Sequence, residues 1–84
     1  MNYYVYMLLS KGIKPVTYVG YTKNIKKRLE LHNNGKGAKF TRGRSWRIIY
    51  KEVFKSKKRA ISREYYIKHN KRIRNEIKKL SVWK

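Results

Sequence analysis

The first part of the chain alternates between apolar runs and turn residues. Residues 2–9 are almost continuously apolar and rich in Tyr, Val and Leu, which predicts a buried strand. The sequence Ser10-Lys11-Gly12 is typical of a turn, and a second short strand is expected at residues 16–20. The two strands are predicted to form an antiparallel hairpin across residues 10–15.

A helix is predicted over residues 25–33, because Asn24 can cap its start and Gly35 can stop it. At roughly 100° per residue, one arc of this helix should face the core. That arc holds Ile25, Arg28, Leu29 and His32. A guanidinium and an imidazole are therefore expected beside the core.

The second part of the chain predicts one more strand and two more helices. Residues 46–54 form the strand, residues 57–69 a helix capped by Ser56, and residues 73–80 a third helical stretch. The apolar stripe of helix 57–69 holds Ala60, Ile61 and Ile67. The order β-β-α-β-α-α predicts an α/β (α+β) fold with a small three-stranded, mainly antiparallel sheet flanked by helices. A chain of 84 residues is expected to be a single domain, 1–84.

The charge balance indicates a type of partner. The chain has 24 Lys and Arg against four Glu and no Asp, a net charge of +20, and it has no cysteine. A polyanion would relieve the self-repulsion of such a chain, which favours nucleic acid over an anionic membrane surface or a merely solvated face. Residues 35–45 form a glycine-rich basic loop, and its predicted nucleic-acid contacts are Lys36, Lys39, Arg42 and Arg44.

No membrane segment is expected. The apolar run at residues 3–9 is far shorter than the ~20 residues of a membrane-spanning helix. It also lacks the basic region that precedes the apolar part of a signal peptide. A cytoplasmic location is therefore predicted.

Glu64 falls in the middle of the apolar stripe of helix 57–69. Burying a lone carboxylate is unfavourable, so Glu64 should either pair with a Lys or Arg or hold a cation. Spacing alone leaves both possibilities open, and Glu76 lies near an apolar stripe as well. Metal motifs such as HExxH and Cys/His clusters are absent from the sequence, and two His with no Asp exclude most familiar hydrolytic sites.

Four further residues have two interpretations each. Arg28 and His32 stand at i and i+4 on one helix face, where they either grip a phosphate or pack as a snorkelling Arg and a hydrogen-bonded His. Tyr6 and Tyr18 either serve a site or pack in the core with a bonded hydroxyl. The residue types alone do not choose between these interpretations.

Taken in order, these residues resemble the GIY-YIG endonuclease domain. The tripeptides Tyr4-Val5-Tyr6 and Tyr18-Val19-Gly20 match its two namesake motifs, with Tyr4 in place of the first Gly. A helix with Arg28 and His32 follows, then the basic loop, then Ala60-x-x-x-Glu64-x-x-Ile67-Lys68. The resemblance runs from Tyr3 to about Lys68 and is to the small stand-alone, single-domain bacterial members.

The resemblance implies a metal-dependent endonuclease. Glu64 would hold Mg²⁺ (or Mn²⁺). Tyr6 would position and deprotonate the attacking water, directly or through a relay. Tyr18 would hydrogen-bond the scissile phosphate or the water.

The resemblance also assigns the remaining positions. Arg28 would stabilise the charge that develops on phosphorus, and His32 would assist Tyr6 or contact the phosphate. Gly20 belongs to the second motif. Many nuclease members carry an Asn after the metal-binding Glu, for which this chain offers Asn70 and Asn75 without a clean alignment of either.

Two functions fit these features. The first is a DNA endonuclease, structure-selective and low in sequence specificity, for which a partner protein would supply targeting. The second is a catalytically weak or inactive nucleic-acid-binding module for DNA or RNA, such as a ribosome-associated protein. A carboxylate in a basic cleft favours the endonuclease, because a protein that only binds nucleic acid has no use for it.

Overall fold

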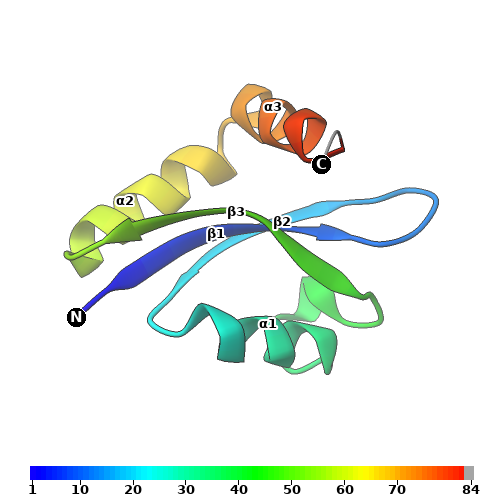
Figure 1. The fold of residues 1–84 in the computed structure, drawn as a ribbon, viewed down its shortest axis with the longest axis horizontal. Coiled ribbons are helices and arrows are strands. Elements are labelled where there is room, and N and C mark those ends of the chain that lie inside the picture. Colours follow the sequence, from blue (N-terminus) through cyan, green and yellow to red (C-terminus); the bar gives the residue numbers. More distant parts are fainter. Residues whose placement is uncertain (83–84) are drawn as a thin grey trace.

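The computed structural model describes residues 1–82, which fold around a three-stranded antiparallel sheet (Figure 1). Strand β1 (Tyr3–Ser10) lies in the centre, between β2 (Thr17–Thr22) and β3 (Trp46–Phe54). The predicted hairpin of the first two strands is confirmed. Both strands lie slightly further along the chain than predicted, because the Ser10 amide donates to the Val16 carbonyl (2.9 Å) and confines the loop to residues 11–15.

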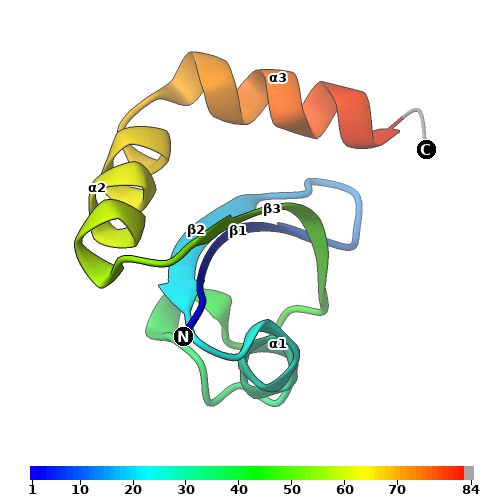
Figure 2. The ribbon, with the colours of Figure 1, turned by 60° about the vertical axis from the view of Figure 1, so that its left-hand side comes forward.

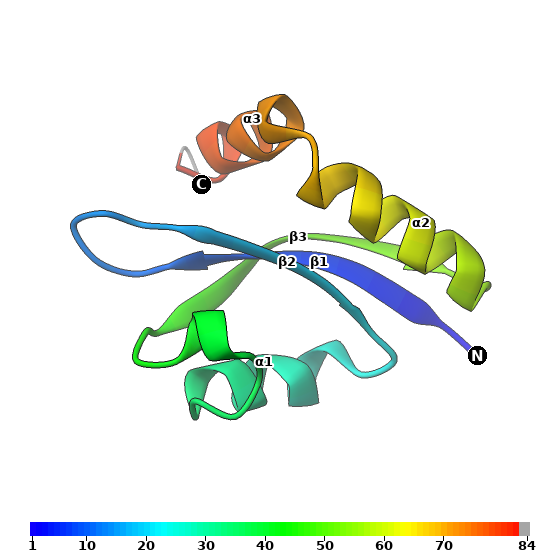
Figure 3. The ribbon, with the colours of Figure 1, turned by 180° about the vertical axis from the view of Figure 1, so that it is seen from behind.

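Helices cover both faces of the sheet. Helix α1 (Ile25–Asn33) lies on one face, and α2 (Lys57–Lys68) and α3 (Lys71–Val82) lie on the other, as Figures 1 and 3 show from opposite sides. Figure 2 shows α3 leaving the end of α2 and crossing over the sheet. The predicted element order and fold class are confirmed.

Side-chain caps set the helix starts. Asn24 Oδ1 accepts from the Lys27 amide (3.1 Å), and Ser56 Oγ accepts from the Arg59 amide (3.3 Å), as their positions predicted. Asn70 Oδ1 accepts from the Ile73 amide (3.2 Å) and caps α3 in the same way. This third cap explains why α2 ends at Lys68 and α3 begins at Lys71, where the sequence predicted 69 and 73.

Strand β1 is buried on both faces, which explains its continuous apolar sequence. Val5 and Met7 pack with Val19, Ala60 and Ile67 beneath α2 and α3. Tyr6 and Leu8 face the opposite way and pack with Trp46 on the side of α1. Alternation along one strand thus supplies two separate cores, and it places Tyr6 on the α1 face.

Strand β3 changes face partway along. Its register against β1 shifts between Met7, which pairs with Tyr50, and Leu8, which pairs with Ile48. This bulge puts residue 52 on the α2 face, where Arg63 donates from Nε to Glu52 Oε1 (2.8 Å). Glu52 is therefore the carboxylate that ties β3 to α2.

The stripe predicted on helix α2 is wrong at one position. Ala60 and Ile67 are buried, but Ile61 is 42% exposed. Ile61 is rotated by about 100° around the helix axis from Ala60, so it lies beyond the face that packs on the sheet. Within residues 1–82, none of the helices has the length and apolar character needed to cross a bilayer.

Candidate active site

The Tyr6 side chain packs across strand β2 at Gly20, which has no side chain to obstruct it. The two residues are register partners in the β1–β2 pair. A Cβ added at Gly20 would lie 2.6 Å from the Tyr6 hydroxyl oxygen and 2.8 Å from its Cζ, closer than real Cβ atoms approach. The glycine of the second tripeptide therefore lets the hydroxyl of the first reach the edge of the sheet.

The Tyr6 hydroxyl forms a hydrogen bond with His32. Its Nε2 lies 2.9 Å from the Tyr6 oxygen, and its Nδ1 lies 2.9 Å from Thr41 Oγ1. Thr41 Oγ1 donates its proton to the Ala38 carbonyl (2.9 Å) and also accepts from the Ala38 amide (3.2 Å). Because that proton is already committed, Nδ1 must be the donor to Thr41. The neutral ring then presents an unprotonated Nε2, and Tyr6 donates to it.

The loop after α1 is fastened to the same helix end. A Cβ at Gly37 would lie 2.3 Å from His32 Nδ1, so the loop backbone packs directly on the imidazole. The next residue, Asn33, accepts from the Trp46 amide through Oδ1 (2.6 Å) and donates through Nδ2 to the Trp46 carbonyl (3.2 Å). Two consecutive side chains of α1 thus hold the loop in place.

Arg28 lies one helical turn before His32 and carries an unmatched donor. Within the described residues, its Nε is buried and has no hydrogen-bond partner. Burial raises the pKa of Tyr6 to about 12, and the Arg28 guanidinium opposes that rise. Burial lowers the pKa of His32, and the charge of Arg28 lowers it further. A buried unpaired guanidinium N–H is costly, which points to an anion as its partner.

Glu64 approaches from α2, on the other side of the sheet. Burial is the main cause of the raised pKa of Tyr6, and the negative charge of Glu64 contributes to it. The Glu64 side chain is 19% exposed and pairs loosely with Lys68, at 3.8 Å between Oε1 and Nζ. An ion pair of this length between neighbouring helical turns contributes little energy, so a cation could displace Lys68 from the carboxylate.

The surroundings of Glu64 bear on metal binding. Among residues 1–82, no three His, Cys, Asp or Glu side chains come together as ligands of one ion. Mg²⁺ is commonly held by one or two carboxylates together with waters and substrate phosphate oxygens. The donor set therefore fits a metal that binds together with a phosphate-containing substrate.

Tyr18 lies between these groups on edge strand β2. Its ring is 4.9 Å from the His32 ring, and the Lys68 Nζ lies 5.8 Å from its centre. Direct contacts join Tyr6, Tyr18 and His32, and the charges of Arg28 and Glu64 both act on the pKa of Tyr6. We call these five residues the Tyr6 cluster.

The other predicted residues lie outside this cluster. The loop cations all point into solvent; they are Lys36, Lys39, Arg42 and Arg44. The amide oxygen of Asn70 is taken up by the α3 cap, and Asn75 is exposed. The Glu76 side chain is 65% exposed, and its Oε1 lies 3.8 Å from Arg72 Nε, outside the cluster.

A family model described as the GIY-YIG catalytic domain matches residues 2–78. The chain belongs to the GIY-YIG family. This is a nuclease family, and the match spans every strand together with α1 and α2. The family named by the two tripeptides is therefore confirmed.

Relatives of this GIY-YIG chain are small bacterial proteins. A UPF0213 protein of Clostridium perfringens is 52% identical over 69 residues, covering 81% of this chain and 71% of the relative. A UPF0213 protein of Lactiplantibacillus plantarum is 47% identical over 74 residues, covering 84% and 71%. The solution NMR structure of the UPF0213 protein BH0048 from Bacillus halodurans is 40% identical, with a TM-score of 0.50, and covers 90% of this chain and 80% of that one.

Sequence reasoning missed the residues that orient the cluster. Thr41 fixes the tautomer of His32, and Gly37 allows the loop to pack on its ring. Neither belongs to a periodic pattern, and both lie in a loop whose glycines and cations indicated only a basic segment that contacts nucleic acid. Asn33 ends α1 next to His32, and its contact with Trp46 depends on a loop path that spacing does not predict.

Proposed function

We propose that this protein is an endonuclease that hydrolyses phosphodiester bonds in DNA, using Mg²⁺ or Mn²⁺ held at Glu64. The observation that carries the proposal is the buried hydrogen bond from Tyr6 to His32 (2.9 Å), next to the unpaired Nε of Arg28. An acceptor for the Tyr6 proton beside a buried, unpaired guanidinium N–H suits the transfer of a proton next to a phosphate. Cleavage of a phosphodiester requires both.

Proton movement follows from the hydrogen bonds. With a pKa of about 12, Tyr6 is neutral at pH 7 and is a weak base by itself. His32 has a lowered pKa, is neutral at the same pH and presents Nε2 to the Tyr6 proton. As Tyr6 accepts a proton from the attacking water, it passes its own to Nε2, while Nδ1 keeps its bond to Thr41. The water oxygen bonds to phosphorus, the P–O bond to the leaving nucleotide breaks, and the departing oxygen takes a proton from solvent.

Charge stabilisation is assigned to the other members of the cluster. Arg28 would donate from its unpaired Nε to a non-bridging oxygen of the scissile phosphate, where negative charge grows in the transition state. Tyr18 would hydrogen-bond the same phosphate. A divalent ion at Glu64, when bound, would supply Lewis-acid stabilisation of the phosphate oxygens.

The charge of the chain supports nucleic acid as the substrate. A net charge of +20, with four exposed cations on the loop after α1, gives affinity for the phosphate backbone that does not depend on sequence. We therefore propose selection by DNA structure and low sequence specificity. A partner protein would supply targeting.

A second function, nucleic-acid binding with weak or no catalysis, is favoured by one observation. The Glu64 carboxylate is partly neutralised by Lys68, at 3.8 Å, and a lone carboxylate binds Mg²⁺ weakly. The same charge that favours DNA would serve binding to RNA. The endonuclease is preferred because the Tyr6–His32 hydrogen bond lies beside the unpaired Nε of Arg28, an arrangement that packing alone does not require.

The test compares two partly buried carboxylates of this chain, Glu64 and Glu52. Glu64→Gln should abolish cleavage of a panel of branched, nicked, single-stranded and linear DNAs in Mg²⁺ or Mn²⁺, with affinity largely kept. Glu52→Gln loses part of the ion pair with Arg63 and should reduce stability while leaving cleavage in place. Absence of wild-type cleavage on every DNA and on RNA would leave the binding module as the function.

A further inference from the structure

Phe40 is exposed although it lies next to the buried hydrogen bonds of the site. Its side chain is 58% exposed, and an exposed Phe gives up a large apolar burial. The following residue, Thr41, is fully buried and accepts from His32 (2.9 Å). The backbone that carries Phe40 is therefore fixed by the site, while its ring is held toward solvent.

The Phe40 ring continues a row of aromatic side chains. It stacks on Tyr18 at 6.3 Å and 23° between planes, and it lies 6.4 Å from Trp46. Tyr18 in turn lies 4.9 Å from the His32 ring. The row runs from His32 through Tyr18 to Phe40, so it connects the proposed site of cleavage to the surface.

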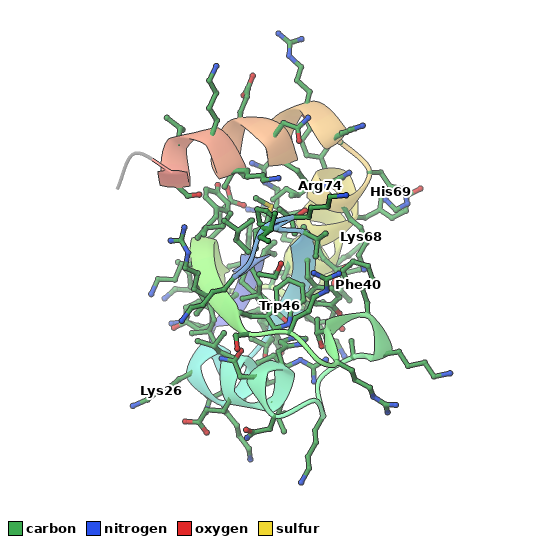
Figure 4. The ribbon with its side chains drawn as sticks, turned by 90° about the vertical axis from the view of Figure 1, so that its right-hand side faces the viewer. Lys26, Phe40, Trp46, Lys68, His69 and Arg74 are labelled. Atoms are coloured by element: carbon green, nitrogen blue, oxygen red, sulfur yellow. The ribbon has the colours of Figure 1, made fainter. Side chains whose placement is uncertain are left out.

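Cations surround the exposed ring. Lys68 holds its Nζ 5.8 Å from the Tyr18 ring, and Figure 4 shows Phe40 and Lys68 on the same side of the molecule. Lys39 and Arg42 flank Phe40 in the loop and are exposed. A flat apolar ring among cations matches a nucleotide, whose base can stack while its phosphates are neutralised. The apolar surface of a partner protein would match the ring and leave the cations without partners.

We propose that Phe40 stacks on an unpaired nucleobase beside the scissile phosphate, so that the enzyme selects DNA with a single-stranded or splayed nucleotide at the point of cleavage. Within a continuous duplex, both faces of each base are covered by its neighbours, so stacking of an aromatic side chain costs least on a base that has left the helix. The stacking on Tyr18 orients the ring before binding, which lowers the entropy cost of the contact. The inference rests on the proposed function, because it places the base relative to the bond that is cut.

The experiment uses the non-cleaving Glu64→Gln protein and DNA with a short single-stranded segment between duplex arms. One 2-aminopurine, whose fluorescence falls when it stacks, is placed at each single-stranded position in turn. Quenching is expected at one or two positions. Adding Phe40→Ala should remove it and weaken affinity by about 10-fold, while affinity for continuous duplex stays the same.

Two further substitutions separate stacking from apolar contact. Phe40→Trp should keep the quenching, because it keeps a flat ring, and Phe40→Leu should lose it, because Leu is apolar and not flat. Equal loss of affinity for duplex and single-stranded DNA in Phe40→Ala, or full quenching with Phe40→Leu, would overturn the inference.

Failure of this inference and failure of the proposed function give different results. If the wild type cleaves DNA but Phe40→Ala keeps the quenching, only the stacking is wrong. If the wild type cleaves nothing and the quenching still depends on Phe40, the base contact stands and cleavage is wrong. In cleaving wild type, an abasic site at the quenched position should lower kcat/KM about as much as Phe40→Ala, and the two changes together should cost no more than either.

Discussion

The Tyr6 hydroxyl donates a buried hydrogen bond to His32 Nε2 (2.9 Å), and the tautomer that this requires is set by Thr41 on the far side of the imidazole. The ring is held at both nitrogens, so it cannot rotate without breaking one bond. The lowered pKa of His32 keeps the ring neutral and able to accept a proton. Protonation of His32 in acid would turn Nε2 into a donor and remove the acceptor of the Tyr6 proton.

We predict that the free energy of unfolding decreases as the pH falls below about 6.5, the ordinary pKa of His. His32 has a lowered pKa in the folded state because of burial and then the charge of Arg28. The unfolded chain therefore binds the proton first, and stability present above that pH is lost toward the folded pKa, by at most about 1.4 kcal/mol per pH unit. Urea unfolding between pH 7.5 and about 5 measures this slope.

The control for this pH dependence is the other histidine. His32→Gln should flatten the slope, whereas His69→Gln should keep it, because His69 is exposed and its Nδ1 bonds to the Tyr65 carbonyl at the end of its own helix. Cleavage should fall over the same range in the wild type. A slope that survives His32→Gln would assign the effect to another group.

Gly20→Ala should damage both stability and cleavage. The new Cβ would lie 2.6 Å from the Tyr6 hydroxyl oxygen, and such overpacking typically costs about 1–3 kcal/mol. Tyr6 would have to move away from His32, so the cleavage rate should fall as well. Denaturant unfolding and single-turnover cleavage measure the two effects separately.

A double-mutant cycle tests the cause. In a Tyr6→Phe background the oxygen is gone, while the ring carbon at 2.8 Å and Tyr18 Cε2 at 3.3 Å remain, so Gly20→Ala should cost less stability there than in the wild type. Cleavage should be low in Tyr6→Phe and in the Tyr6→Phe, Gly20→Ala double variant, since both lack the hydroxyl that donates to His32. Equal costs in the two backgrounds would show that the hydroxyl does not cause the strain.

Much of the fold could be predicted because local rules agree with tertiary packing here. The Asn24 cap and Gly35 stop give the bounds of α1, and the bounds of β3, Trp46–Phe54, are those predicted. The grouping of Tyr6 with Glu64 came from the family resemblance, since nothing in local spacing joins the first strand to the fifth predicted element. Hydrophobic periodicity predicted which faces of the helices and strands are buried, and the family resemblance predicted which residues form the candidate site.

The remaining features depend on register and loop path. The bulge opposite Met7 and Leu8 is a shift of one position in pairing, and it moves Glu52 to the face where it meets Arg63. Thr41 and Phe40 are single loop residues whose roles follow from a 3₁₀ turn that composition does not reveal. No sequence pattern encodes such features, because they arise when distant backbone segments come together.

DNA binding should be steeply dependent on salt. If the four loop cations each neutralise one phosphate, log K should fall against log salt with a slope of about −3.6. Titrations with Glu64→Gln avoid cleavage during the measurement. Lys39→Ala should make the slope less negative by about 0.9. Lys26→Ala is the matched control, because Figure 4 shows Lys26 on the opposite side from Phe40, and its slope should not change.

Arg28 should govern the rate of cleavage and contribute little to affinity. Its Nε is buried, and within the described residues nothing accepts a hydrogen bond from this nitrogen, so the donor is available to the phosphate of bound DNA. Arg28→Ala should lower the single-turnover rate by roughly 10²–10³-fold, the usual cost of losing one preorganised donor. Affinity should change little, because one phosphate contact is a small share of the electrostatic total.

Arg28→Lys should not restore the rate, since an ammonium has no donor in the position of Nε and cannot make a planar contact. Arg42→Ala, in the exposed loop, provides the opposite case: it should weaken binding while the rate at saturating DNA stays near that of the wild type. Single-turnover cleavage and a binding titration on each variant separate the two roles. Loss of affinity with an unchanged rate in Arg28→Ala would make Arg28 a docking residue, and its unpaired Nε would then serve ground-state binding of the phosphate instead of its transition state.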